Sequence, residues 1–192
     1  MNEFQHVIRP VRGDEWEKVK DLRIAALNDP AAPVAFLETV EQAASRPDDF
    51  WQARAEGASH GRAARQFVAV GPGGRWDGSV TVLVEVAGTA DIFDVEIERT
   101  QGHLVGVFVR DGQRGTGLVD ALFAAALEWA WSLDEPVLER VRLFVHEENA
   151  RAEAFYRRFG FEATGKVQVL SGDADASDAK DLEYVYPRPA GV

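Results

Sequence analysis

The spacing of hydrophobic residues along the chain predicts alternating strands and helices. Apolar, β-prone runs predict strands over residues 7–11, 66–70, 79–86, 104–109, 141–145, 161–170 and 182–186. A stretch rich in glycine and proline separates the second run from the third, which predicts a hairpin. The run 104–109 is apolar at nearly every position, as is typical of a strand buried on both faces. Residues 171–180 are polar and acidic and predict a mobile loop.

Helical spacing of apolar residues predicts helices over 16–27, 118–133 and 150–159. We expect Asp14 to cap the start of the first helix and Gly160 to end the last one in a left-handed conformation. Pro47 divides a further helical pattern into two short helices. The order of hairpin, buried strand, long helix, strand, helix and strand indicates one domain, residues 1–192, of the mixed α/β (α+β) class with a central sheet.

Composition narrows the classes of function. The chain has 192 residues, 46% of them hydrophobic, and a formal net charge of −11, so it can bury a core and repels nucleic acid. Cysteine is absent, which excludes disulfides, thiolate metal sites and a cysteine nucleophile. The sequence shows neither a targeting signal nor an apolar run long enough to span a membrane, and we expect a cytoplasmic protein without a membrane partner.

A glycine-rich stretch between the buried strand and the long helix carries the first chemical signal. It reads Arg110-Asp111-Gly112-Gln113-Arg114-Gly115-Thr116-Gly117-Leu118-Val119. Glycines at a helix start let an anion approach the free N–H groups and the positive end of the helix dipole, which predicts a pyrophosphate cradle. The alternative is a tight turn without a ligand. The glycine order G-x-x-G-x-G matches neither a Rossmann nor a Walker loop.

This stretch resembles motif A of the GNAT family of acetyl-CoA-dependent N-acetyltransferases, Arg/Gln-x-x-Gly-x-Gly/Ala. It departs from the motif at Val119, where the family has a small residue, and we expect this side chain to crowd the loop. Residues 141–161 are similar to the family's second signature, a strand followed by Asn-x-x-Ala-x-x-x-Tyr-x-x-x-Gly-Phe, which begins here at Asn149. The two motifs follow in the family's order, so the resemblance covers most of the chain.

The resemblance implies a central, mostly antiparallel sheet flanked by helices, with one splayed pair of strands that binds the coenzyme. The backbone of Val107, Phe108 and Val109 would pair with the pantetheine arm, although the same residues also suit a plain core strand. The resemblance assigns the pyrophosphate to Arg114, Gly115, Thr116, Gly117, Leu118 and Val119. Asn149 would contact the coenzyme near the pantetheine, and an ordinary helix N-cap is the alternative.

Tyr156 matches the family tyrosine that lies near the thioester sulfur. A neutral phenol, with an ordinary pKa near ~10, can donate a proton, or at least a hydrogen bond, to a departing thiolate whose thiol has a pKa near ~8.5. The resemblance therefore implies that Tyr156 acts as the general acid, while its alternative is a core aromatic side chain on the inner face of the helix.

The attacking amine must lose a proton, and His103 is our candidate base. It lies at the start of the buried strand, near the offset at which some GNAT enzymes carry a catalytic Glu, and an imidazole titrates near ~6.5. A strand-end histidine without a catalytic role is the alternative. Glu85, Asp91 and Asp94 are rival bases.

These features predict an enzyme that moves an acetyl group from acetyl-CoA, as co-substrate, directly to a primary amine. The acceptor is a small molecule or a protein amine, and the acidic composition favours a cationic one. Phe36, Trp51 and Asp173 or Asp175 are candidate acceptor contacts. The alternative function is a non-catalytic acyl-CoA-binding regulatory domain. The resemblance to the family also favours a homodimer that forms through the last strands. No metal site is expected, because His146 has no second histidine at ligand spacing.

Overall fold

A seven-stranded sheet, in the order β1-β2-β3-β4-β5-β7-β6, runs through the molecule. The computed structural model describes residues 5–169 and 180–191. The strands are β1 (Val7–Pro10), β2 (Ala64–Val70), β3 (Trp76–Glu85), β4 (Gln101–Val109), β5 (Arg140–His146), β6 (Glu162–Val169) and β7 (Lys180–Pro187). All neighbouring strands are antiparallel except β4 and β5, which are parallel. The mixed, mostly antiparallel sheet confirms the predicted fold class.

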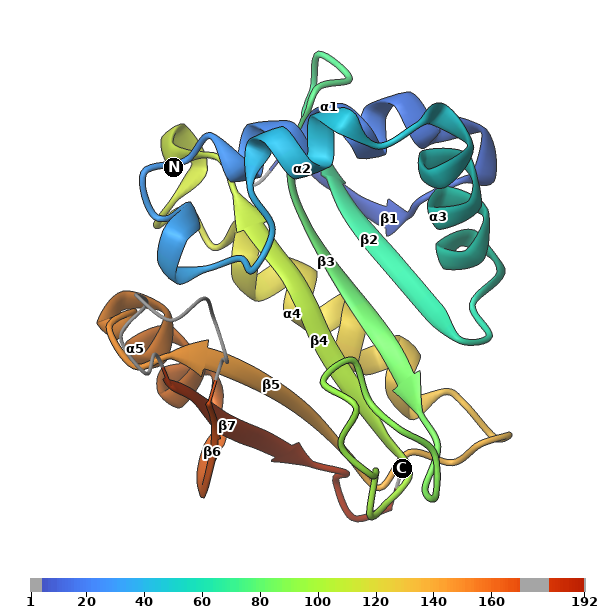
Figure 1. Cartoon of the computed structure of the whole chain (residues 1–192), viewed down its shortest axis with the longest axis vertical. Coiled ribbons are helices and arrows are strands. Elements are labelled where there is room, and N and C mark those ends of the chain that lie inside the picture. Colours follow the sequence, from blue (N-terminus) through green and yellow to red (C-terminus); the bar gives the residue numbers. More distant parts are fainter. Residues whose placement is uncertain (1–4, 170–179, 192) are drawn as a thin grey trace.

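Helices cover both faces of the sheet (Figure 1). They are α1 (Trp16–Leu27), α2 (Val40–Ser45), α3 (Asp48–His60), α4 (Leu118–Trp131) and α5 (Ala150–Phe159). Pro47 separates α2 from α3, and Gly160 ends α5 in a left-handed conformation, as predicted. The expectation that Asp14 caps α1 is wrong, because a 3-10 turn over Gly13–Glu15 precedes α1 and moves the cap position to Glu15.

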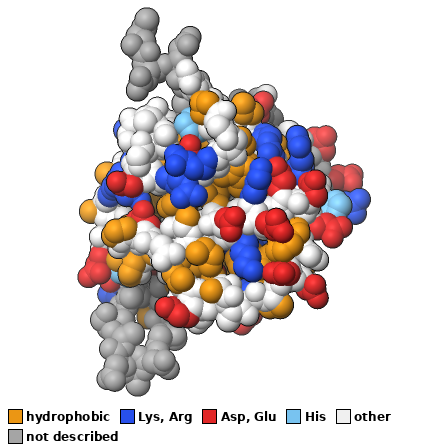
Figure 2. Space-filling view, turned by 90° about the horizontal axis from the view of Figure 1, so that it is seen from above, with side chains coloured by type: hydrophobic (Ala, Val, Ile, Leu, Met, Phe, Trp, Pro, Cys, Tyr) orange, Lys and Arg blue, Asp and Glu red, His pale blue; other side chains and the backbone are white. Residues whose placement is uncertain are grey.

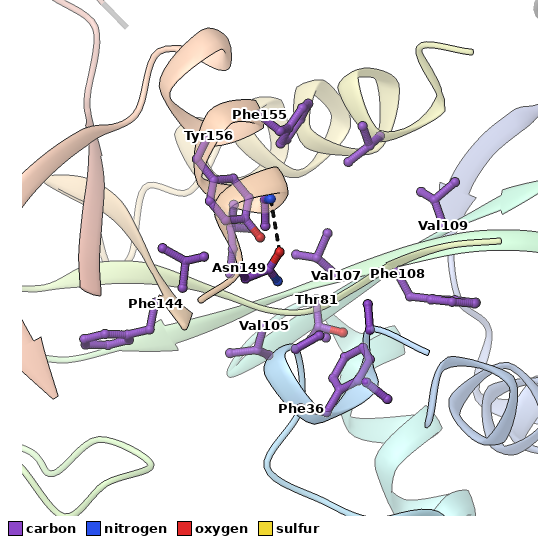
Figure 3. Close-up of a pocket in the computed structure, with 18 of the residues that line it drawn as sticks. Phe36, Thr81, Val105, Val107, Phe108, Val109, Phe144, Asn149, Phe155 and Tyr156 are labelled. Carbon is purple, nitrogen blue, oxygen red and sulfur yellow. Dashed lines mark hydrogen bonds between the residues drawn. The ribbon is translucent and has the colours of Figure 1, made fainter. Parts of the chain in front are cut away.

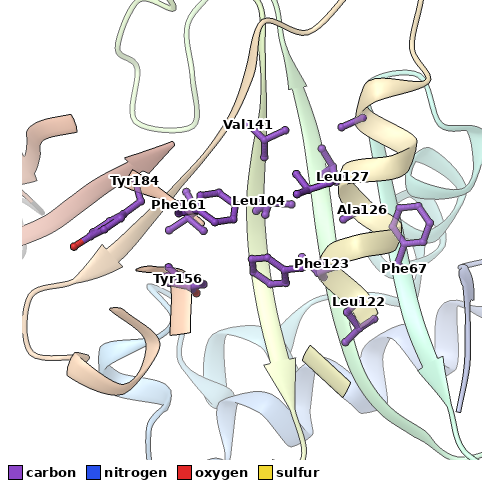
Figure 4. Close-up of a cluster of buried hydrophobic side chains, with 14 of the residues drawn as sticks. Phe67, Leu104, Leu122, Phe123, Ala126, Leu127, Val141, Tyr156, Phe161 and Tyr184 are labelled. Carbon is purple, nitrogen blue, oxygen red and sulfur yellow. The ribbon is translucent and has the colours of Figure 1, made fainter. Parts of the chain in front are cut away.

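Two separate hydrophobic cores lie on opposite faces of the sheet. One packs α4 and α5 against the sheet around the fully buried Phe123, which contacts the rings of Tyr156 and Phe161 (Figure 4). The other packs α1, α2 and α3 around Trp51. Since side chains alternate between the two faces along each strand, the residues that face α3 cannot join the α4 core. This division decides which strand residues are available to a site on the α3 side.

The parallel pair of β4 and β5 is hydrogen-bonded at one end only. Its register contains just two pairs, Gly102 with Val141 and His103 with Arg142, and beyond them the strands diverge (Figure 1). Gly106 adds one residue to β4 opposite β3 and has a φ of +63°, which a bulge of this kind requires and glycine accepts readily. The prediction that residues 104–109 are buried on both faces is therefore only half right, because Val105, Val107 and Val109 border the opening.

Two further predictions concern membrane-spanning helices and the loop over residues 171–180. None of the helices within residues 5–169 and 180–191 is long and apolar enough to cross a membrane. The loop predicted over residues 171–180 lies, apart from Lys180, outside the described residues.

Candidate active site

The divergence of β4 and β5 opens into a cleft of about 1350 Å³. Its walls are the second half of β4, the end of β5, the start of α4, one side of α5, and the segment 31–37 with α3 (Figure 3). Every backbone group of a strand needs a hydrogen-bond partner, and β4 has none from β5 after His103. An extended ligand can supply those bonds by lying along β4 as a strand would.

The glycine stretch forms the end wall of the cleft, at the N-terminus of α4. Gly115 and Gly117 have φ values of +76° and +87°, and open space surrounds the position where a Cβ would stand. Gly117 is the N-cap of α4 and makes no side-chain cap, so the first N–H groups of the helix face the cleft without a protein partner of that kind. The geometry suits a bound phosphate, which a helix N-terminus attracts through its dipole.

The side chains of this stretch mostly serve other contacts. Arg114 forms ion pairs with Asp29 and Asp111, and the Thr116 hydroxyl donates to the carbonyl of Gln113 at 2.7 Å. Leu118 is fully buried in the core, whereas Val119 borders the cleft. The donors that the structure leaves available to an anion here are therefore backbone N–H groups, because the Arg114 guanidinium is shared between two carboxylates.

Tyr156 lies at the junction of the cleft and the α4 core. Its ring packs against Phe123 with a centroid distance of 5.8 Å, and only 7% of the residue is exposed. Its hydroxyl points into the cleft toward Asn149 and Val107 (Figure 3) and has no hydrogen-bond partner among the described residues. Burial raises the pKa of Tyr156 far above its ordinary value, so the phenol stays protonated at neutral pH.

Asn149 caps α5. Its side-chain oxygen accepts a hydrogen bond from the N–H of Ala152 at 3.2 Å, and its amide donates a longer one, 3.4 Å, to the carbonyl of Val34. The helix-cap alternative is therefore realised in the structure. The contact with Val34 also joins α5 to the segment 31–37 across the cleft.

His103 is buried in the floor of the cleft, and its Nδ1 atom lies 2.8 Å from a carboxylate oxygen of Glu85. Burial raises the pKa of Glu85, but hydrogen bonds from His103 and Arg142 outweigh this effect and lower it to about 2. Glu85 is thus ionised and can only accept, which requires the proton of a neutral His103 to reside on Nδ1. The Nε2 atom is left as the basic nitrogen.

The three rival acids are poorly suited to act as the base. Glu85 holds its carboxylate against His103, Gln101 and Arg142, and a carboxylate whose pKa is lowered to about 2 is too weak a base to take the proton of an attacking amine. Asp91 binds Arg142 at 2.7 Å; burial raises its pKa, but backbone N–H groups and Arg142 lower it further. Asp94 is exposed on a loop and does not border the cleft.

The comparison with known families agrees with this geometry. Residues 36–161 match the sequence model described as the acetyltransferase (GNAT) family. The chain belongs to the GNAT family. Members of this family are acyltransferases that use acetyl-CoA, and so is this chain. The open edge of β4 and the glycine-bounded start of α4 are consistent with this membership. No curated protein sequence matches the chain.

Solved structures share the fold over nearly the whole chain. Arabidopsis thaliana NAA60 in complex with a bisubstrate analogue is 17% identical, with a TM-score of 0.69 over 96% of this chain and 100% of that one. A spermidine N-acetyltransferase chimera of Vibrio cholerae SpeG and hSSAT is also 17% identical, with a TM-score of 0.66 over 95% of each chain. Nourseothricin acetyltransferase is 29% identical over 66% of each chain, with a TM-score of 0.51.

The acceptor half of this GNAT cleft differs from the sequence expectation. Phe36 lines the cleft, but Trp51 does not, because α3 turns its ring into the core between α1 and the sheet, where it is fully buried. The assignment of Trp51 to the acceptor is therefore wrong. Asp173 and Asp175 lie outside the described residues.

Sequence reasoning also missed several residues that border the cleft, namely Arg23, Arg54, Gly106, Arg151, Arg158 and Asp181. Arg151 and Arg158 belong to α5 and are seven residues apart, a spacing that places them on one face of the helix and could have signalled them. Burial raises the pKa of Asp181, and His146 on the neighbouring strand partly opposes the shift. The part of the chain that the structure describes contains no cluster of three or more His, Asp or Glu side chains suited to a metal ion.

Proposed function

We propose that the chain transfers the acetyl group of acetyl-CoA directly to a primary amine, with Tyr156 as general acid and His103 as general base. The observation that carries this proposal is the meeting of three features in one cleft: the unpaired edge of β4, the glycine-bounded start of α4 and the unbonded hydroxyl of Tyr156. An unpaired strand edge of this kind, without the phenol of Tyr156, would support binding of the coenzyme alone.

The backbone of Val107, Phe108 and Val109 pairs with the pantetheine arm, and N–H groups at the start of α4 hold the pyrophosphate. Arg151 also borders the cleft and has no carboxylate partner among the described residues, which supports a role in phosphate binding. Val119 narrows this end of the cleft, since its side chain exceeds the Gly or Ala of the family motif. Asn149 orients the start of α5 through its cap.

In the chemical step, the amine nitrogen bonds to the thioester carbonyl carbon and the C–S bond breaks. The carbonyl oxygen gains negative charge, which an N–H group of β4 near Val107 stabilises. The Nε2 atom of His103 takes the proton that the nitrogen loses, directly or through one water. The Tyr156 hydroxyl donates its proton, or a hydrogen bond, to the departing thiolate.

Titration calorimetry with acetyl-CoA, followed by a thiol-release assay on the same sample with a panel of amines and peptides, tests this function. We expect binding and acceptor-dependent release of free CoA. Binding without release for every acceptor would favour a regulatory acyl-CoA-binding domain, and a lack of binding would overturn the proposal. Loss of release in both His103→Ala and Tyr156→Phe, with coenzyme binding retained, would separate chemistry from binding.

A further inference from the structure

One wall of the cleft contains a partly buried cation that the transfer reaction leaves without a role. Arg54, on α3, is partly buried and borders both the main cleft and a small cavity of about 20 Å³ beneath α1. It makes no hydrogen bond or ion pair with any described residue, and its nearest aromatic contact is Trp51, whose ring centroid lies 5.9 Å from the guanidinium carbon. A guanidinium that is partly withdrawn from water and has no carboxylate partner is a favourable binding group for an anionic part of a ligand.

The charged side chains around Arg54 do not provide it with a carboxylate. Arg23, on α1, pairs with Glu38 at 3.1 Å, and Glu38 in turn pairs with Arg46 at 2.9 Å, so the nearest carboxylate is already shared by two other arginines. Desolvation, and then the charge of Arg23, lower the pKa of Arg54 from its ordinary value. Arg54 therefore keeps a positive charge that no described carboxylate neutralises directly.

The floor below Arg54 is polar. Gln66 and Thr81 are register partners on β2 and β3, both are buried, and both border the cleft and the small cavity together with Arg54. Their side chains form no hydrogen bonds with the described residues. An amide, a hydroxyl and a guanidinium that converge on one space match the oxygens of a carboxylate.

The residues that line the cleft carry a net charge opposite in sign to that of the whole chain. Its described lining contains five arginines and three aspartates, a net charge of +2 with the histidines neutral, whereas the chain carries −11. Arg114 and Arg158 pair with Asp29 and Asp120 near the coenzyme end. Figure 2 shows basic side chains around exposed hydrophobic atoms near the middle of one face. The net charge of the cleft lining therefore differs in sign from the charge of the whole chain, which favours a cationic acceptor.

We infer that the acceptor is a primary amine that also carries a carboxylate, and that Arg54, with Gln66 and Thr81 beneath it, binds this carboxylate. The inference rests on the proposed acetyl transfer and names its substrate class. The position suits this role, because Arg54, Gln66 and Thr81 lie on the α3 side of the sheet, as His103 does, whereas α4 packs against the other side. The carboxylate would fix the acceptor while its amine faces the thioester and the base.

The test compares matched acceptors in the thiol-release assay with saturating acetyl-CoA. Each free amino acid is paired with its own amide, which keeps the amine and removes the negative charge, and an acidic peptide and spermidine complete the panel. We expect kcat/KM for the carboxylate form to exceed that for the amide by about tenfold or more. The acidic peptide separates a macromolecular source of the carboxylate from a free amino acid.

Arg54→Gln should lower kcat/KM for carboxylate acceptors by about 10- to 100-fold, mainly through KM, and should leave the affinity for acetyl-CoA unchanged. Arg54→Lys should restore part of the loss. Arg62→Ala, an exposed arginine away from the cleft, is the matched control and should change neither value. Circular dichroism and the melting temperature confirm that each variant is folded.

The outcomes separate the two proposals. Turnover of amides and spermidine equal to that of the carboxylate acceptors, or an unchanged preference in Arg54→Gln, would overturn the carboxylate site while acetyl transfer stands. If no acceptor turns over, calorimetric binding of the same panel to the protein saturated with CoA decides the question. Carboxylate-dependent binding lost in Arg54→Gln would support the site, and its absence would overturn it.

Discussion

The Nδ1 atom of His103 lies 2.8 Å from Oε1 of Glu85, and neither side chain is more than 5% exposed. The ionised carboxylate fixes the imidazole in the tautomer that leaves Nε2 free. Replacement of Glu85 by Gln removes this constraint and also the negative charge that stabilises the imidazolium. We expect kcat to fall by about tenfold or more, and the acid limb of the pH–rate profile to move to lower pH.

The pH–rate profile also tests whether His103 is the general base. His103→Ala should abolish the acid limb of the pH–rate profile and lower kcat by about 100-fold. Persistence of the limb in this variant would assign the base to another group, with Asp181 as the remaining cleft carboxylate whose pKa is raised by burial. Replacement of Asp181 by Asn is the direct comparison.

Tyr156→Phe removes one hydroxyl and keeps the ring that packs on Phe123. We expect kcat to fall by about 10- to 100-fold with little change in the affinity for acetyl-CoA, because the loss affects only the departing thiolate. Tyr186→Phe, which removes a hydroxyl from a tyrosine that packs on Phe161 outside the cleft, is the matched control. Equal rates for the parent and Tyr156→Phe would limit Tyr156 to packing.

Coenzyme affinity should depend more on Gly117 than on Arg114. An alanine at Gly117 would have to adopt a φ of +87°, which is strained by about 1–2 kcal/mol, and the first N–H groups of α4 would shift. Arg114 already divides its guanidinium between Asp29 and Asp111. We therefore expect Gly117→Ala to weaken acetyl-CoA binding by about tenfold or more in calorimetry, and Arg114→Ala to weaken it less. The reverse order would assign the pyrophosphate to the guanidinium.

Glu85 should also make the fold sensitive to acid. Its pKa is lowered to about 2 in the folded chain and is ordinary in the unfolded one, so the stabilisation is complete above pH ~4.5 and is lost as the pH falls toward 2. The contribution is at most about 3 kcal/mol. Urea unfolding at several pH values should show a weaker dependence in Glu85→Gln over this window. Glu128→Gln, an exposed control on α4, should retain the parent slope.

The sequence predicted those features that depend on local spacing. The change of period at Gly115 located α4, and the motif spacing brought Asn149 and Tyr156 onto one helix beside the cleft. Tyr156 lies on the inner face of α5, so its interpretations as acid and as core aromatic are both compatible with its position.

Features that depend on register or helix rotation could not be predicted. Glu85 and His103 are 18 residues apart and meet only because β3 and β4 pair with a particular offset. The bulge at Gly106 is a single left-handed residue within an apolar run. Trp51 and Arg54 lie on one helix, and the periodicity of α3 did not reveal that the aromatic ring faces the core while the cation borders the cleft.

The two-pair contact between β4 and β5 gives the molecule an internal sheet edge. A strand edge with unsatisfied backbone groups is a template for any other strand, including one from a second copy of the chain. Acetyl-CoA, laid along β4, would cover that edge as well as react. Depletion of the coenzyme would then do more than stop turnover. The chain with an uncovered β4 edge would be the form most exposed to aggregation and proteolysis.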